Sequence, residues 1–414
     1  EVYDPCSADL TSYWDIAVDA VNSTITFDTD HYELSSNGDA NEIFYLDATA
    51  GVSIESGKNY YIFFDIKDGT ETSEGFDLVN LNGTTVEEST AGTTESVWKR
   101  HIHRFTATAN TDGAGIRIPA DLAGDDIEIR KAVIVEVTGY NTISQNTVID
   151  GGINLLTVVA SEYNTITKNK LYNVYVTDKT ELVGGDKLKV KDASANNTIT
   201  YNWTFNDLAT NDTDIHGNGI TVQWSDYNDV FYNMIGPYTE DGLVFTASHY
   251  NEAYGNTVYK TNGANIYPML IIENGSDYSL DINEPADYNT IKNNIFYQVL
   301  DPDLPTGYSQ EQFMFGSNAL GDAGSGNNNT ISYNQIYCEG GVEATTDIFY
   351  WNETGDSATT WYTWTEWQSY RAGKYVGNTL YSDPLLYNPA AHDYSLTSTS
   401  PAVDAGDDLG SSFD

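Results

Sequence analysis

Cysteine and basic residues are scarce in this chain of 414 residues. It has two cysteines, Cys6 and Cys338, and 18 Lys plus Arg against 61 Asp plus Glu, so the formal net charge is -43. Two cysteines do not make a disulfide framework, so a Cys6–Cys338 bond, within one chain or between two, and a pair of buried thiols both stay open. Nucleic acid and anionic lipid need a cationic footprint, and we expect neither as a partner.

Long hydrophobic runs are also missing. The longest apolar stretches, "YYIFF" and "YPMLII", are far shorter than the roughly 20 residues of a membrane-spanning helix. We therefore expect no membrane insertion within this chain. No charged-then-apolar leader follows Glu1, as in a mature chain whose signal peptide has been removed, so we expect an extracellular or cell-surface protein with a hydrated acidic surface.

The chain is rich in one short phrase, N-x-[IVA]-x-x-N. Its seven copies begin at Asn141, Asn164, Asn197, Asn228, Asn251, Asn289 and Asn329, and a degraded eighth copy begins at Asn378. Successive starts are 23, 33, 31, 23, 38, 40 and 49 residues apart. Each phrase holds a short β-type run, and a second run, such as Leu155 to Val159, follows. This pattern predicts a solenoid in which one repeat is one coil and only stacking buries its apolar residues.

The phrase also predicts the register of the solenoid. Thr-Ile pairs such as Thr142-Ile143 and Thr165-Ile166 are expected to form parallel, in-register strands with each Ile inside. Asn tolerates left-handed backbone angles, so we expect it at the bends, and coils stacked about 4.8 Å apart make it a hydrogen-bonded ladder.

From residue 139 to 414 the chain resembles the right-handed parallel β-helix, or pectin-lyase-like, proteins. The seven phrases carry this resemblance, and so does the ending "NTLYSDPLLYNPAAHDYSLTSTSPAVDAG" within residues 378–410. The resemblance implies a β-helix followed by a closing segment.

Residues 1–138 lack the phrase and alternate with period two, which predicts an antiparallel β-sandwich. At "VWKRHIHRFTATANTDGAGIRI" and "DDIEIRKAVIVEV" this segment resembles the jelly-roll carbohydrate-binding modules of secreted polysaccharide enzymes. That resemblance implies that exposed aromatic residues stack on sugar faces, while burial in the core is the alternative role. The candidates are Tyr13, Trp14, Tyr60, Tyr61 and Trp98.

A tryptophan-rich excursion, residues 343–376, interrupts the solenoid near its end. Trp361, Trp364 and Trp367 are spaced to share one face of a short helix. We expect this excursion to cover the open end or side of the β-helix, because an uncapped solenoid exposes apolar surface and strand edges. A sugar-binding platform that includes Trp361 and Trp364 is the functional alternative.

One acidic cluster is a candidate active site. Aligning the coils places Asn218 over Asp241 and Gly217 over Glu240, and "NDTDIHGNG" adds Asp212, Asp214 and His216. A hydrolase needs two carboxylates about 5 Å or about 6.5–9.5 Å apart, and Asp214, His216, Glu240 and Asp241 are the residues proposed for that chemistry. A structural Ca²⁺ site formed by Asp212, Asp214 and Asp241, or no cofactor at all, are the alternatives, and ordinary loop acids are the third.

A lyase is less favoured than a hydrolase, because related lyases use Arg or Lys as base. These coils contain almost no Arg, and Lys187, Lys189 and Lys191 are expected to form one exposed strand edge.

Eight glycosylation sequons occur, about as many as chance provides in so Asn-, Ser- and Thr-rich a chain. They are Asn22, Asn82, Asn196, Asn202, Asn211, Asn274, Asn328 and Asn352.

These patterns favour an extracellular structural or adhesive protein that binds a polysaccharide or glycan. Assembly with copies of itself is a further hypothesis: an N-terminal arm, residues 1–10, with Cys6 would join the far end of the solenoid, with Cys338, head to tail into a filament. A polysaccharide hydrolase is the alternative function, and a viral fibre or spike is the third.

Overall fold

The computed structural model is an all-β protein that divides into two compact units. One contains Glu1–Thr138, and the other contains Gly139–Gly275 and Asn283–Asp414. The described residues are 2–3, 14–17, 24–28, 31–35, 42–46, 54–68, 76–80, 86–90, 99–107, 114–118, 126–151, 154–174, 185–206, 217–237, 241–261, 268–273, 286–299, 313–316, 329–339, 347–351, 360–370 and 378–408.

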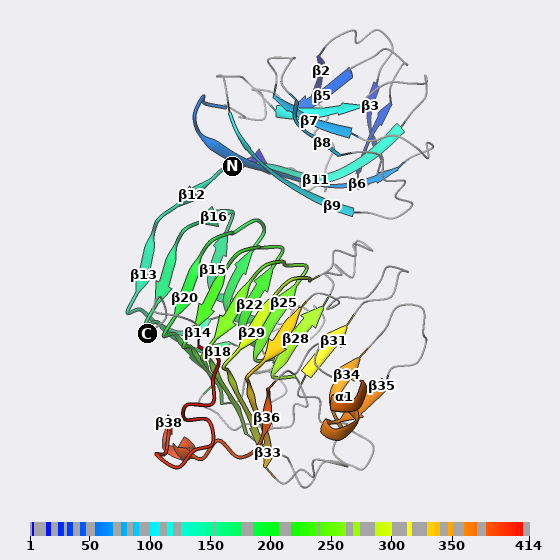
Figure 1. Ribbon diagram of the computed structural model, residues 1–414. Coiled ribbons are helices and arrows are strands. Elements are labelled where there is room, and N and C mark those ends of the chain that lie inside the picture. The colour runs from blue at the N-terminus through cyan, green and yellow to red at the C-terminus, as the bar shows by residue number, and fades with distance from the viewer. Residues whose placement is uncertain are drawn as a thin grey trace. The chain divides into compact units, whose positions relative to one another are not determined.

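The first unit is the predicted antiparallel β-sandwich (Figure 1). Its long strands β6 (Asn59–Asp68) and β11 (Asp126–Glu136) pair with each other, and β9 (Lys99–Thr106) pairs with β6. The same sheet holds β1 (Val2–Tyr3), β3 (Thr24–Asp28) and β4 (His31–Ser35). The second sheet holds β2 (Trp14–Ala17), β5 (Glu42–Leu46), β7 (Phe76–Asn80), β8 (Val86–Thr90) and β10 (Ala114–Ile118).

The expected N-terminal arm is partly wrong. Val2 and Tyr3 pair antiparallel with Ile134 and Val133, so the first residues belong to a sandwich sheet. Cys6 lies outside the described residues, and the proposed disulfide stays a prediction.

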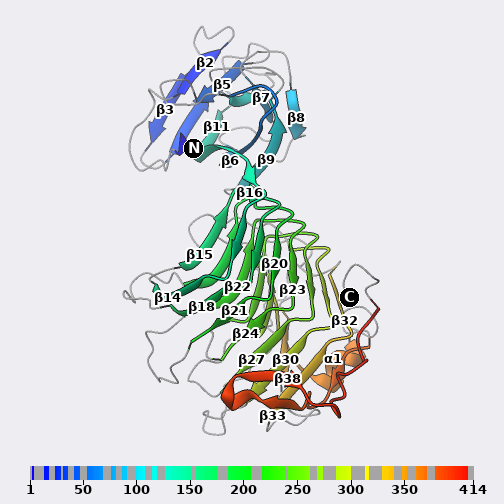
Figure 2. The same ribbon diagram turned by 90° about the vertical axis from the view of Figure 1, so that its left-hand side faces the viewer.

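The second unit is the predicted parallel β-helix, built from three sheets whose strands recur once per coil (Figures 1 and 2). Within the described residues each of the first seven coils has three strands, one more than the repeat pattern predicted. The first sheet contains β13 (Thr142–Ser144), β17 (Thr165–Thr167), β20 (Thr198–Thr200), β23 (Asp229–Phe231), β26 (Glu252–Tyr254), β29 (Thr290–Lys292) and β32 (Thr330–Ser332).

The second and third sheets follow the first along each coil. The second sheet contains β14 (Thr147–Gly151), β18 (Lys170–Val174), β21 (Trp203–Phe205), β24 (Met234–Ile235), β27 (Thr257–Lys260), β30 (Ile295–Val299), β33 (Gln335–Glu339) and β36 (Leu380–Tyr381). The third contains β15 (Asn154–Val159), β19 (Asp186–Lys191), β22 (Asn218–Gln223), β25 (Leu243–Thr246), β28 (Leu270–Glu273), β31 (Phe313–Gly316), β34 (Asp347–Trp351) and β35 (Thr360–Thr363). A separate two-stranded sheet contains β12 (Thr138–Gly139), which precedes β13, and β16 (Ser161–Glu162), which precedes β17.

The predicted register is confirmed. In the first sheet Thr142 pairs with Thr165, and Ile143 pairs with Ile166, in parallel, and the same offset continues to β32. Ile166, Ile199 and Ile291 are fully buried. The predicted alignment of Ile220 with Leu243 in the third sheet is also confirmed.

Two asparagine ladders run along the edges of the first sheet. Asn197 Oδ1 accepts hydrogen bonds from the backbone N–H and Nδ2 of Asn164, at 2.9 and 2.7 Å, and the same pattern repeats between other neighbouring coils. The left-handed residue at each bend was predicted wrongly: it usually comes directly before the Asn. Tyr163 (φ 54°) and Tyr227 (φ 57°) adopt this conformation. The Asn that follows each of them forms the ladder hydrogen bonds with its side chain.

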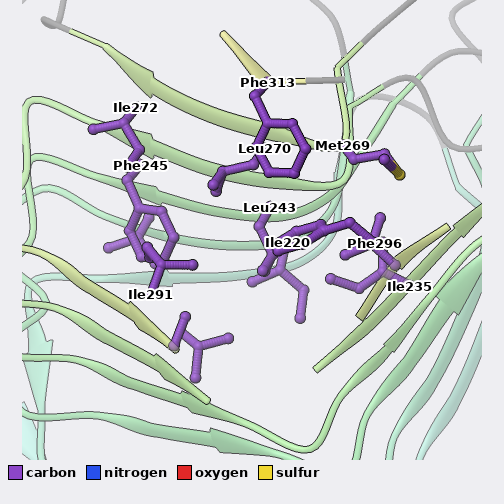
Figure 3. Close-up of a cluster of buried hydrophobic side chains, with 14 of the residues drawn as sticks. Ile220, Ile235, Leu243, Phe245, Met269, Leu270, Ile272, Ile291, Phe296 and Phe313 are labelled. Atoms are coloured by element: carbon purple, nitrogen blue, oxygen red, sulfur yellow. The ribbon is translucent and has the colours of Figure 1, made fainter. Parts of the chain in front are cut away.

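The core of the second unit is a continuous apolar column inside the coils. Leu243, Phe245 and Leu270 of the third sheet meet Ile291 of the first and Phe296 of the second (Figure 3). Cys338, on β33, is a buried member of this core, and burial raises the pKa of its thiol. A bond from Cys338 to another chain would require this core to open.

The tryptophan-rich excursion packs onto the end of this core, as the capping prediction expects. Its helix α1 (Trp364–Tyr370) carries Trp364 and Trp367, which are 2 % and 0 % exposed. The Trp367 ring stacks on Phe349 at 4.7 Å. Trp361 lies on strand β35, not on the helix, so the expectation of three tryptophans on one helical face is wrong.

The closing segment folds back along the solenoid (Figure 2). It contains β37 (Leu386–Asn388), a 3₁₀ turn (Pro389–Ala391) and β38 (Asp393–Leu396). The Tyr394 ring contacts Tyr259 of the second sheet at 5.0 Å. The Asp407 carboxylate accepts a hydrogen bond from Lys292 Nζ at 3.0 Å, so the segment contacts the solenoid both at its middle and near its end.

Among the described residues, no helix has both the length and the apolar character to span a bilayer.

The ladders predict a difference between two similar substitutions. Asn197→Ala should lower the free energy of unfolding by about 3 kcal/mol, because it leaves the buried Asn164 N–H and the Ser161 and Ser194 carbonyls without these partners. Asn141→Ala, at the exposed start of the same ladder, should cost under about 1 kcal/mol. Urea denaturation followed by circular dichroism measures both. Equal losses of unfolding free energy in the two variants would contradict a larger contribution from the buried part of the ladder.

Candidate functional site

The outward side of the first sheet, here called the ladder face, is a regular array of side chains. Since each central residue of these strands points inward, the residues on either side of it point outward. Three successive coils present Thr or Ser at both outward positions: Thr142 and Ser144, Thr165 and Thr167, Thr198 and Thr200. The face therefore displays rows of hydroxyl groups that repeat with the coil spacing.

A column of tyrosines borders the ladder face on the side where each coil enters the sheet. Tyr227 stacks on Tyr250 at 5.0 Å, and Tyr250 stacks on Tyr288 at 4.9 Å, with interplanar angles of 3° and 10°. Near the start of the solenoid, Tyr140 stacks on Tyr163 at 5.1 Å. All five rings are substantially exposed, from 44 % for Tyr250 to 81 % for Tyr140. Asn196 occupies the same position in the coil between the two groups.

The stacking follows from the backbone. Each of these tyrosines has a left-handed conformation, with φ between 54° and 59°, which turns its side chain out of the coil. Equivalent positions lie one coil apart, so the rings meet face to face and expose their edges and hydroxyl groups. Stacking of this kind is favourable for aromatic pairs.

Acids and one histidine lie beside this column. The backbone N–H of His249 donates to the Asp226 carboxylate at 2.7 Å, and the N–H of Asp287 donates to His249 Nδ1 at 3.3 Å. Burial raises the pKa of Asp226, although its bond from His249 opposes this. These contacts fix the bend that carries Tyr250.

Two coils of the ladder face have no hydroxyl-bearing Thr or Ser at either outward position. Asp229 and Glu252 replace Thr and lie directly opposite each other on β23 and β26. Burial, and then the charge of Glu252, raise the pKa of Asp229 to about 6. The other outward residues of these coils, Phe231 and Tyr254, stack at 5.4 Å. An acidic pair beside aromatic rings thus interrupts the face.

The acidic cluster predicted on the third sheet is only partly described. Asp241 lies above Asn218 as predicted, and its N–H donates to Asn218 Oδ1 at 3.4 Å. Toward the preceding coil, Asn218 Nδ2 donates a hydrogen bond to Asp186 Oδ1 at 2.9 Å. Asp186 also pairs with Lys189 at 2.9 Å. Asn218 therefore separates these two carboxylates.

Asp212, Asp214, His216 and Glu240 lie outside the described residues, so the hydrolase and Ca²⁺ hypotheses stay predictions. In the ranges that are described, no three His, Cys, Asp or Glu residues are placed to hold a metal ion. The lysine prediction is wrong, because β19 is paired on both sides and Lys187 is buried, donating to Gly217 O at 2.8 Å.

The carbohydrate-binding candidates are corrected at three residues. Tyr61 is 5 % exposed and lies in the core. Tyr60 is 4 % exposed, and its hydroxyl accepts a hydrogen bond from Glu55 N at 2.9 Å, so it is a core residue. Trp364 is in the core of the solenoid, where no ligand reaches its face. Tyr13 and Trp98 lie outside the described residues, and the side chains of Trp14 and Trp361 are not among those described.

Of the sequons, Asn202 is corrected and Asn196 stays available. Asn202 is 1 % exposed, and its Nδ2 donates to Ile166 O and Asn233 Oδ1, so no glycan can be attached there without breaking a ladder. Asn196 is partly exposed at a bend. Asn22, Asn82, Asn211, Asn274, Asn328 and Asn352 lie outside the described residues.

The sequence analysis missed both features of the ladder face, although the signal was present. Tyr directly precedes the first Asn of five phrases, as in Tyr227-Asn228. Two successive phrases replace Thr-Ile-Thr by Asp-Val-Phe and Glu-Ala-Tyr. Reading the phrase by its deviations, and not only by its constant part, would have found them.

No protein-family model and no curated protein matches the chain. Some solved carbohydrate-binding domains are similar to about a third of it. One described as "CBM4 structure and function" is 15 % identical, with a TM-score of 0.24, and the match covers 30 % of this chain and 96 % of that one. The CBM22-1 xylan-binding domain from Paenibacillus barcinonensis Xyn10C is 10 % identical, with a TM-score of 0.25, over 32 % and 92 %. The N-terminal cellulose-binding domain from Cellulomonas fimi beta-1,4-glucanase C is 14 % identical, with a TM-score of 0.25, over 33 % and 95 %. Similarity this low does not tell what the chain binds.

The acidic pair predicts a pH-dependent stability. Because the pKa of Asp229 rises from 3.8 to about 6 on folding, the fold favours the protonated form, and stability falls as the pH rises from about 4 to about 6. Asp229→Asn should then raise the melting temperature at pH 7.5 by about 2–4 °C, after discounting for screening of a half-exposed carboxylate.

The two melting temperatures should converge near pH 4. Asp404→Asn, on an exposed turn, removes the same charge and serves as control. A gain for Asp229→Asn that is equal at both pH values, or that the control shares, would contradict the assigned repulsion.

Proposed function

We propose that this protein is an extracellular structural or adhesive protein whose ladder face contacts a neutral polysaccharide. The exposed tyrosine column carries this proposal. Exposed aromatic residues are normally scattered singly, whereas a contiguous row on a rigid scaffold is typical of a binding surface. Tyr227, Tyr250 and Tyr288 form such a row.

The chemistry of the face supports a carbohydrate as the partner. Tyrosine combines apolar ring surface with a hydroxyl group, and the Thr rows add further donors and acceptors. A sugar polymer presents the same two kinds of group, namely C–H surface and hydroxyls. A neutral polymer is favoured because the net charge of -43 repels polyanions.

The geometry supports an extended partner. Equivalent positions recur about every 4.8 Å along the solenoid, so a polymer lying along the axis meets one set of outward side chains per coil, first hydroxyl groups and then, from β23 on, acidic and aromatic groups as well. Weak contacts that repeat in this way add up through multivalency. This favours adhesion to a long chain or a fibrous surface over capture of a small molecule.

A hydrolase is the second candidate, because Asp229 and Glu252 lie on adjacent coils of the same face. Strand neighbours are about 4.8 Å apart, close to the carboxylate separation of about 5 Å in retaining glycosidases. A general acid needs a raised pKa, and the pKa of Asp229 is about 6. Sugar release from a polysaccharide panel, abolished by Glu252→Gln, would support this candidate over adhesion alone.

The test of adhesion replaces one tyrosine by the residue that the chain itself uses at the same position. Tyr250→Asn copies Asn196, so the left-handed bend is kept while the ring is removed. Retention on insoluble cellulose, xylan, mannan and chitin should weaken by roughly threefold to tenfold, since an aromatic contact contributes about 0.5–1.5 kcal/mol.

Tyr387→Asn is the matched control, because Tyr387 is 68 % exposed but lies on the closing segment. It should bind like the unchanged protein. If the full chain binds no polysaccharide of the panel, or if both substitutions weaken binding equally, the ladder face is not the contact surface.

A further inference from the structure

A cavity of about 340 Å³ lies between the closing segment and the second sheet. Thr257, Ile295 and Gln335 line it from strands β27, β30 and β33, and Tyr394 and Ala402 line it from the closing segment. The volume is near the lower end of the range of about 300–1,000 Å³ for small-molecule sites. The cavity lies on a different sheet from the ladder face.

Every residue that lines this cavity is uncharged. That is unexpected in a chain where 19 % of the residues are charged. The polar lining consists instead of amide and hydroxyl side chains, including Asn293, Gln335, Thr257 and Ser395. Groups of this kind hydrogen-bond to neutral ligands without a desolvated charge, so the lining selects against ionic ligands.

One buried polar atom in the lining has no partner. Gln335 is 3 % exposed, and its Nε2 donates to Ser382 O at 2.6 Å and to Ser382 Oγ at 3.0 Å. These bonds fix the amide orientation, while Oε1 has no hydrogen-bond partner. Because Oε1 is shielded from solvent, it is not an acceptor for a ligand, and the polar groups of the lining that a ligand can reach are on other side chains, such as Thr257 and Ser395.

Two tyrosines complete the lining. Tyr394 is held in place by its ring contact with Tyr259 and by a 3.1 Å hydrogen bond between its hydroxyl and His392 Nδ1. Tyr333 lies at a left-handed bend (φ 55°) on the opposite side, next to the ladder residue Asn334. Aromatic rings beside amides and hydroxyls are a combination that suits a ring with one apolar and several polar groups.

We propose that this cavity binds one neutral sugar residue, such as the end unit of a glycan. The aromatic rings contact the C–H surface of the sugar, and sugar hydroxyls hydrogen-bond to hydroxyl groups of the lining, such as those of Thr257 and Ser395. This site is separate from the ladder face and does not depend on the function proposed for that face. It would give the protein recognition of a chain end in addition to contact along a chain.

The experiment compares two neighbouring positions on one turn. Ala402 lines the cavity, whereas Val403 is 45 % exposed and does not. Ala402→Phe fills the cavity, and Val403→Phe adds the same volume outside it. Ligand-observed NMR titrations use the full chain with the methyl glycosides of glucose, galactose, mannose, xylose and N-acetylglucosamine, and with glucuronate as the charged comparison.

At least one neutral glycoside should bind the unchanged chain and the Val403→Phe chain with equal affinity. Ala402→Phe should weaken that binding by about tenfold or more, and glucuronate should not bind. If Ala402→Phe unfolds the chain, Ala405→Phe fills the same cavity from another position. Tyr250→Asn should leave this binding unchanged, which separates the cavity from the ladder face.

Three results would overturn the proposal. These are the absence of binding by every neutral glycoside, binding that survives the filled cavity, and a crystal soaked in the best glycoside that holds only ordered water between Tyr333 and Tyr394. Loss of polysaccharide retention in Tyr250→Asn together with normal glycoside binding would uphold both proposals. Normal retention together with loss of glycoside binding in Ala402→Phe would uphold the cavity alone.

Discussion

The hydrogen bond from one asparagine to the asparagine of the next coil holds the solenoid in register. In most such pairs, as between Asn164 and Asn197, one amide oxygen accepts two donors, a backbone N–H and a side-chain Nδ2. The groups at these bends are buried and would otherwise lack partners. Because the ladders occupy both edges of the first sheet, they fix its width and the position of every outward side chain. The hydroxyl rows and the tyrosine column follow from that constraint.

The first sheet could be predicted because its pattern is local. The spacing from Asn to Asn never changes, and a single inward residue, such as Ile166 or Ile199, sets which residues face out. The second-sheet strands were missed because outward residues, such as Trp203 and Phe205 of β21, are aromatic and break the alternation. They are aromatic because the closing segment, through His392, packs against them. A contact over that distance along the chain leaves no local signal.

The candidate site was predicted less well, for a related reason. Acids that are clustered along the sequence suggested a site on the third sheet, yet the opposed carboxylates of Asp229 and Glu252 are 23 residues apart and meet only through stacking. In a solenoid, which side chains come together depends more on which residues face each other on adjacent coils than on which residues are close in the sequence. Tyr60 and Trp364 show a different error: they were candidates for exposed sugar-binding residues and are buried. The residue type alone does not tell whether an aromatic side chain lies in the core or on the surface.

The constant ladder has a consequence for how such a chain changes in length. Coils differ in length from 23 to 49 residues, yet every phrase keeps its spacing, so the extra residues enter only outside the first sheet. Removing a single residue between two ladder asparagines shifts all outward side chains to the wrong face. Removing a whole coil does not, because Asn197 would then meet Asn251 in place of Asn228. The ladder face can therefore grow or shrink only by one whole coil at a time while its hydrogen-bond pattern stays intact.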